Sequence, residues 1–114
     1  MKVLYLDHDK QIPYHDILYF EHYHKFENSL NRITILYTTN QQYILRNKIK
    51  DIFLSLDPTE FMMPHQSFIV NMRYIQVFSQ SHLLLDNNKR IPISIKRAAI
   101  VRIQFLDYIQ KKRA

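Results

Sequence analysis

Two segments of this chain place neutral or positive hydrogen-bonding side chains at the ends of short apolar runs. The first is His65-Gln66-Ser67, which precedes an apolar run, and the second is Ser94 to Arg97, which follows one. Glutamine can pair with adenine through two hydrogen bonds, and lysine or arginine can pair with guanine or phosphate. Across Phe61 to Arg97 the only acid is Asp86. Contact with a polyanion is the chemistry that these segments favour.

Each segment also has a plainer interpretation. His65-Gln66-Ser67 could be a turn whose polar groups bond only their own backbone. Lys96-Arg97 could be an ordinary solvated surface, and the polar stretch Asn28 to Arg32 could be a simple connector. Charge position favours binding, because eight Lys or Arg residues follow Asp86 against one further acid, Asp107. The second half of the chain is therefore predicted to be the binding half.

Composition bounds the class of protein. The chain has 114 residues, 46% hydrophobic and 23% charged, which predicts a single globular domain over residues 1–114. The net charge of +6 favours phosphate-rich partners. The chain has no cysteine, and no apolar run is long enough for a transmembrane helix, so we expect a cytoplasmic location without a membrane partner.

No residue pattern predicts catalysis, so we expect a protein that is not an enzyme and has no cofactor. The absence of glycine disfavours phosphate-cradling loops. His22 and His24 are spaced as ligands on one strand face, but no third ligand is evident, which disfavours a metal site. Ser67 and His65 could be placed in a nucleophilic triad, although nothing in their spacing supports it.

Hydrophobic periodicity predicts a mainly β domain of antiparallel sheets, with about ten short strands, one mid-chain helix and one C-terminal helix. The expected strands are Lys2–Leu6, Gln11–Tyr14, Ile17–Glu27, Arg32–Thr38, Gln41–Leu45, Phe61–Met63, Phe68–Val70, Tyr74–Phe78, His82–Leu85 and Arg90–Ile93.

The expected helices follow from apolar stripes. Ile49, Ile52, Phe53 and Leu56 predict the mid-chain helix, which ends at Asp57-Pro58. Ser94 is expected to cap the last helix, whose apolar stripe is predicted at Ala99, Ile103 and Leu106. Without glycine, Asn40 and the run Asp86 to Lys89 are expected to supply left-handed turn residues.

The whole pattern resembles the LytTR family, the DNA-binding output domains of bacterial response regulators. The likeness covers about Lys2 to Ile109 and rests on three signatures. Asp16-Ile17-Leu18-Tyr19-Phe20-Glu21 is similar to the family's D-I-x-Y-I-E strand. The most specific signature, Phe61 to Asn71, is similar to its F-x-R-x-H-x-S-y-I-V-N core, and Ile91-Pro92-Ile93-Ser94 is similar to its I-P-V-S segment.

The resemblance implies an elongated, mainly β fold that reads double-stranded DNA with loops in successive major grooves. It also implies two tandem copies on direct-repeat promoter sites, and structural roles for His65 and Asn71. The base-reading or backbone-contacting positions of the family fall here on Asn31, Gln66 and Lys96, and the neighbours expected to bind phosphate are Arg32, Ser67 and Arg97.

Three departures from the family pattern bear on the contact residues. Met63-Pro64 stands where the family often has a basic residue, and the loop Lys25 to Asn31, which ends at one contact position, is longer than usual. Lys96 replaces a frequent arginine, which removes bidentate guanine geometry.

Partners beyond DNA follow from the same resemblance. Most family members carry a receiver domain, so we expect either the C-terminal part of a longer regulator or a short regulator without a receiver. The alternative to a DNA reader is a protein-interaction or inhibitory module on the same fold. Such a module could use the exposed edge strand Lys2–Leu6 to pair with a partner strand.

Overall fold

The computed structural model describes residues 2–6, 10–23 and 33–113. In this part of the chain, ten strands form three antiparallel sheets, accompanied by two α-helices and three short 3-10 turns. The elements are β1 Val3–Tyr5, β2 Gln11–Pro13, β3 Ile17–Tyr23, β4 Ile33–Thr38, β5 Gln42–Leu45, α1 Ile49–Ser55, β6 Phe61–His65, β7 Phe68–Asn71, β8 Ile75–Phe78, β9 His82–Leu85, β10 Arg90–Pro92 and α2 Ala98–Arg113. The predicted fold class is confirmed.

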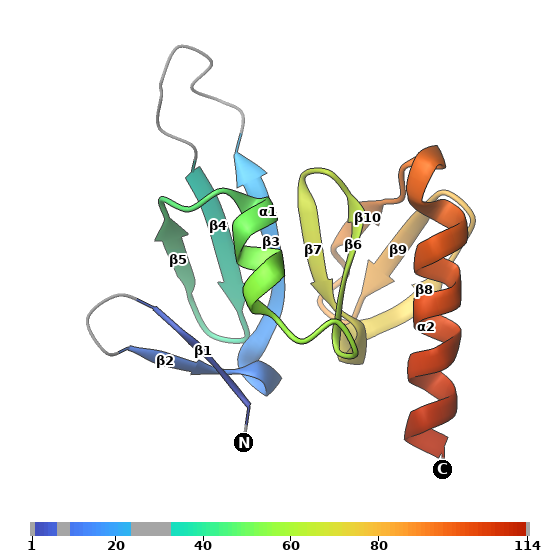
Figure 1. Cartoon of the computed structure of the whole chain (residues 1–114), viewed down its shortest axis with the longest axis horizontal. Helices are drawn as coiled ribbons and strands as arrows, with labels where there is room; N and C mark the ends of the chain where they lie inside the picture. The colour runs from blue at the N-terminus through green and yellow to red at the C-terminus, as the bar shows by residue number, and fades with distance from the viewer. Residues whose placement is uncertain (1, 7–9, 24–32, 114) are drawn as a thin grey trace.

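A five-stranded sheet in the order β5-β4-β3-β7-β6 forms the centre of the molecule. The helix α1 and the hairpin β1–β2 cover one of its faces, and the three-stranded sheet β10-β9-β8 with α2 covers the other (Figure 1). Each face has its own hydrophobic core. The principal extents are 41 × 33 × 24 Å.

Strand β3 is buried on both faces, which explains its unbroken apolar run. Ile17 and Phe20 belong to the core under α1, whereas Leu18 and Tyr19 belong to the core under α2. The pairing of β3 with β4 shifts register between Ile17 and Tyr19. A bulge of this kind lets side chains depart from strict alternation between the two faces of a sheet.

The predicted apolar stripe of the last helix is wrong. Ala99, Ile103 and Leu106 are exposed, and α2 packs on the core through Ala98, Val101, Phe105 and Tyr108. Both sets follow the spacing of one helix face, so periodicity alone could not select between them.

Two local predictions were also wrong in part. Ser94 precedes a 3-10 turn, Ile95–Arg97, and its side chain caps nothing, although its carbonyl accepts the Arg97 N–H at 3.1 Å. Among the described residues the only positive φ is that of Asn88, at 69°, so Asn40 is not left-handed. The run from Asp86 to Lys89 does supply the left-handed residue, as expected. In the described part of the chain no helix is long and apolar enough to span a membrane.

A charged cluster joins the start of the chain to the segment between α1 and β6. The Lys2 ammonium donates to the carboxylate of Asp57 and lies 3.0 Å from that of Glu60. Asp57 also accepts the N–H of Thr59 at 2.9 Å and its hydroxyl at 2.7 Å. The hydrogen bond from Lys2, followed by those from Thr59, lowers the pKa of Asp57 from 3.8 to about 2.

The Asp57 cluster predicts a defined acid dependence of stability. Because the pKa of Asp57 is lower in the folded state, its contribution is complete above pH 3.8 and is lost as the pH falls through about 2. Asp57→Asn should lower the free energy of unfolding by about 1 kcal/mol at neutral pH, since the cluster lies near the surface. It should also flatten the decline between those two pH values. Urea denaturation at several pH values measures both effects, and an unchanged acid decline in the variant would contradict the assignment.

Candidate nucleic-acid interface

Gln66 and Ser67 form the two-residue turn between β6 and β7. His65 pairs with Phe68 across the turn, and its Nδ1 accepts the Ser67 N–H at 3.1 Å. The Ser67 carbonyl in turn accepts the His22 N–H of β3 at 2.8 Å. His65 therefore supports the turn from within, as expected, and Gln66 is left exposed at its tip.

The second predicted segment is hydrogen-bonded to the same hairpin. The Ser94 N–H donates to the Pro64 carbonyl at 2.9 Å, and Nη1 of Arg97 donates to the Met63 carbonyl at 3.4 Å. Met63 and Pro64 lie where the pairing of β6 with β7 shifts register, so their carbonyls are available to a neighbour. Gln66 and Lys96 are thereby placed on segments that meet, although they are thirty positions apart in the sequence.

Two lysines that the sequence patterns did not single out lie at the same turn. Lys48 and Lys50, at the start of α1, line a hollow of about 420 Å³ together with Gln66 and Ser67, and the acid Asp51 lines it as well. Both lysine side chains are exposed, and neither has a partner among the described residues. Their position off the apolar stripe of α1 was visible in the sequence. Their proximity to Gln66 depends on how α1 packs across the sheet, which no local pattern encodes.

The predicted contact residues divide into three groups. Gln66 and Lys96 are exposed and have no hydrogen-bond or ion-pair partner within the described part of the chain. Ser67 is only 5% exposed, and Arg97 is half-buried against β6. Asn31 and Arg32 lie outside the described residues. The first described residue after them, Ile33, pairs with Tyr23 at the sheet end that also carries the β6–β7 turn (Figure 1).

Lys89 lies beside the turn and is partly neutralised. Its ammonium is 3.7 Å from the Glu21 carboxylate and lies over the rings of Tyr19 and Phe68. Burial, followed by the charges of Tyr37 and Glu21, raises the pKa of Tyr19, so its phenol is neutral. Lys48, Lys50 and Lys96 are exposed and have no ion-pair partner among the described residues, while Asp51 lines the same hollow as the first two.

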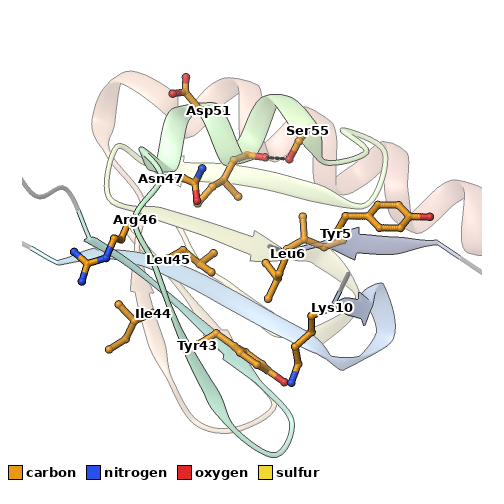
Figure 2. Close-up of a pocket in the computed structure, with 12 residues that line it drawn as sticks. Tyr5, Leu6, Lys10, Tyr43, Ile44, Leu45, Arg46, Asn47, Asp51 and Ser55 are labelled. Atoms are coloured by element: carbon orange, nitrogen blue, oxygen red, sulfur yellow. Dashed lines mark hydrogen bonds between the residues drawn. The ribbon is translucent and has the colours of Figure 1, made fainter. Parts of the chain in front are cut away.

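A different hollow, of about 520 Å³, lies between the β1–β2 hairpin, β5 and α1 (Figure 2). Its lining combines apolar side chains such as Leu4 and Leu45 with Lys10, whose ammonium lies 4.9 Å from the centre of the Tyr43 ring. It contains none of the predicted contact residues.

Asn71 anchors the C-terminal end of β7. Its side-chain amide donates to the carbonyls of Tyr14 and Ile17, each at 2.9 Å, and its Oδ1 accepts the Arg73 N–H at 3.2 Å. The residue is 2% exposed. Asn71 therefore has the structural role that the sequence predicted, joining β7 to the start of β3.

An exposed glutamine and exposed lysines without ion-pair partners among the described residues suit contact with a polyanion. The family model of the LytTR DNA-binding domain matches residues 7–106. The chain therefore belongs to the LytTR DNA-binding domain family, which confirms the resemblance seen in the sequence.

Known proteins agree with this assignment. Over 101 residues the chain is 25% identical to the transcriptional regulatory protein YpdB of Escherichia coli, and the match covers 85% of this chain and 38% of that protein. A solved LytTR DNA-binding domain of a methyl-accepting/DNA response regulator from Bacillus cereus superposes with a TM-score of 0.70 at 22% identity. That superposition covers 90% of this chain and 94% of the other, and it shows a common fold.

The hydrogen bonds of the Asn71 side chain predict that an aspartate at this position destabilises the fold. Asn71→Asp removes the amide that satisfies two carbonyls and places a carboxylate against them, which should destabilise the fold by about 3 kcal/mol. Asn87→Asp is the matched control, because exposed Asn87 uses only its Oδ1, which accepts the Lys89 N–H at 3.1 Å. Urea denaturation of both variants tests the prediction, and equal stability of the two would refute the role of the amide.

Proposed function

We propose that this domain is the output domain of a bacterial two-component response regulator and reads direct-repeat promoter sites in a sequence-specific manner. The observation that carries the proposal is the hydrogen bonding of the Ser94–Arg97 segment to Met63 and Pro64 of β6, the strand that leads into the β6–β7 turn. Gln66 and Lys96 lie on these two segments, and both are exposed and without partners in the described part of the chain. A side chain that is free in the unbound protein can meet a base edge without first breaking an internal bond.

The proposed contacts differ in kind. Gln66 offers both an acceptor and donors, which suits a base edge in the major groove. Lys96 offers a positive charge that can meet guanine or phosphate, and Asn31 is assigned to a base by its position in the family motif. Arg32 and Arg97 are assigned to phosphates. Ser67, whose backbone N–H is donated to Nδ1 of His65, is assigned to a phosphate as the neighbour of Gln66.

The proposed setting is the cytoplasm, without catalysis or a cofactor. The chain spans 38% of the length of the transcriptional regulator that it matches, so a receiver domain is proposed as the partner that controls it. Two copies would bind one site in the same orientation, one on each repeat.

Selection from a pool of random-sequence duplexes tests the proposal without any operator being chosen in advance. The expected result is enrichment of one short motif present twice in the same orientation. Fluorescence anisotropy should then show preferential binding to the selected duplex over a scrambled one that persists at physiological salt. Absence of enrichment, or equal affinity for both duplexes, would refute specific reading. No DNA binding even at low salt would support the protein-interaction module instead.

If Gln66 and Lys96 contact bases, replacing either residue should reduce the preference for the operator over a scrambled duplex. Gln66→Ala and Lys96→Ala should each weaken operator binding by about 1–3 kcal/mol, with little change on the scrambled duplex. Gln42→Ala and Lys112→Ala are matched controls, because both residues are exposed. Gln42 begins β5 and Lys112 lies in the last turn of α2, and both of these element ends are opposite the β6–β7 turn (Figure 1). An equal loss on both duplexes would reassign the residue to a phosphate.

The lysines at the start of α1 are expected to affect affinity for all DNA sequences and its dependence on salt. The combined substitution Lys48→Ala and Lys50→Ala should weaken binding to all sequences and reduce the slope of log affinity against log salt by about 2, one unit per phosphate. The combined substitution Lys111→Ala and Lys112→Ala removes the same charge at the far end of α2 and should leave the slope unchanged. Equal slopes for the two double variants would show that Lys48 and Lys50 do not contact DNA.

A further inference from the structure

The outer face of α2 and the turn before it carry a cluster of exposed apolar side chains. Eight large hydrophobic residues are exposed in the described part of the chain, and four of them lie between positions 95 and 106. Their exposed fractions are 98% for Ile95, 61% for Ile100, 67% for Ile103 and 53% for Leu106. Single exposed apolar residues are ordinary, whereas such a cluster on one element marks a surface that another molecule covers.

The spacing along this face is that of a coiled-coil seam. Ala99, Ile103, Leu106 and Gln110 follow one another at intervals of four, three and four residues, and all four are exposed. In heptad terms they occupy positions d, a, d and a. Isoleucine at a with leucine at d favours a parallel two-stranded coiled coil. The opposite positions, c and f, hold the residues Ala98, Val101, Phe105 and Tyr108 that attach α2 to its own core.

The charged residues beside the seam are also complementary when the two helices are parallel. Arg102 occupies position g and Asp107 the next position e, so a parallel pair places each Arg102 beside the partner's Asp107. Arg102 is exposed and has no ion-pair partner among the described residues. Asp107 lies 3.0 Å from Lys111 on its own helix, an exposed pair of the kind that contributes little and can be exchanged.

We propose that α2 binds α2 of a second copy of this chain, as a parallel two-stranded coiled coil with a two-fold axis along the helices. The occupant of the outer face is a second copy, because both the seam residues and the flanking charges complement themselves. The helix has 16 residues, which allows about two heptads, so the association is weak in the isolated domain.

The orientation has a consequence for DNA. Both helices begin beside the Ser94–Arg97 segment, so a parallel pair presents the two reading ends on the same side (Figure 1). The two copies on one direct-repeat site share an orientation and are related by translation, whereas the α2 pair is related by a two-fold axis. The proposed contact therefore joins copies that are bound to different sites. It does not depend on the proposed function, because it can be measured without DNA.

Sedimentation equilibrium from about 10 μM to about 1 mM tests the association. We expect a reversible monomer–dimer equilibrium, and Ile103→Glu should raise its dissociation constant by a factor on the order of ten or more. Leu54→Glu is the matched control, because Leu54 is 80% exposed but lies on α1. Circular dichroism verifies that both variants fold. A monomer at every concentration, or a dimer that Ile103→Glu leaves unchanged, would overturn the proposal.

Disulfide crosslinking tests the orientation, because the chain contains no cysteine. In a parallel pair, Ala99→Cys and Gln110→Cys each bring two identical positions within reach of a disulfide, since both positions lie on the seam. Lys112→Cys is exposed but lies off the seam, and should crosslink far more slowly. An antiparallel pair would separate the two copies of position 110. Crosslinking at Lys112→Cys as fast as at Gln110→Cys, or none at the seam positions, would exclude the proposed pair.

Discussion

The central sheet must be covered on both faces, and the rest of the architecture follows from this requirement. β3 is apolar on both sides, so one layer alone would leave half of its side chains in water. The helix α1 and the first hairpin form one cover, and the three-stranded sheet with α2 forms the other. The hairpin directly precedes β3 in the sequence, whereas α1 and the second cover follow β5. The hydrophobic effect therefore brings segments that are remote in the sequence onto the same sheet.

The position of the proposed contact residues results from this arrangement. β7 runs antiparallel to β3, so the β6–β7 turn lies at the end where β3 finishes and β4 begins. The cover on one face brings the start of α1 to that end, and the cover on the other brings Ser94–Arg97. The hydrogen bonds to the Pro64 and Met63 carbonyls then determine how the second segment meets the turn. Pro64 can stand in β6 because β6 is an edge strand, where a missing N–H breaks no bond within the sheet. Its carbonyl still accepts the hydrogen bond from Ser94.

The elements and the motif residues were predictable from the sequence to different degrees. Strands, the mid-chain helix and the structural roles of His65 and Asn71 were predictable, because they depend on local periodicity or on residues within one motif. The face that α2 buries was not, because α2 is apolar on two sides and only the shape of the core selects Val101 and Phe105 over Ile103 and Leu106. The position of Lys48 near Gln66 was not predictable either, because it is set by contacts between residues far apart in the chain.

The two apolar faces of α2 have different physical consequences. The face that carries Val101 is enclosed by the domain, and its burial contributes to folding whether or not another molecule is present. The face that carries Ile103 gains nothing from folding, because it is exposed in the folded domain. Apolar surface that folding does not remove from water is a cost to solubility in a monomer. Its arrangement as a seam, flanked by Arg102 and Asp107, makes a second copy the molecule that relieves this cost.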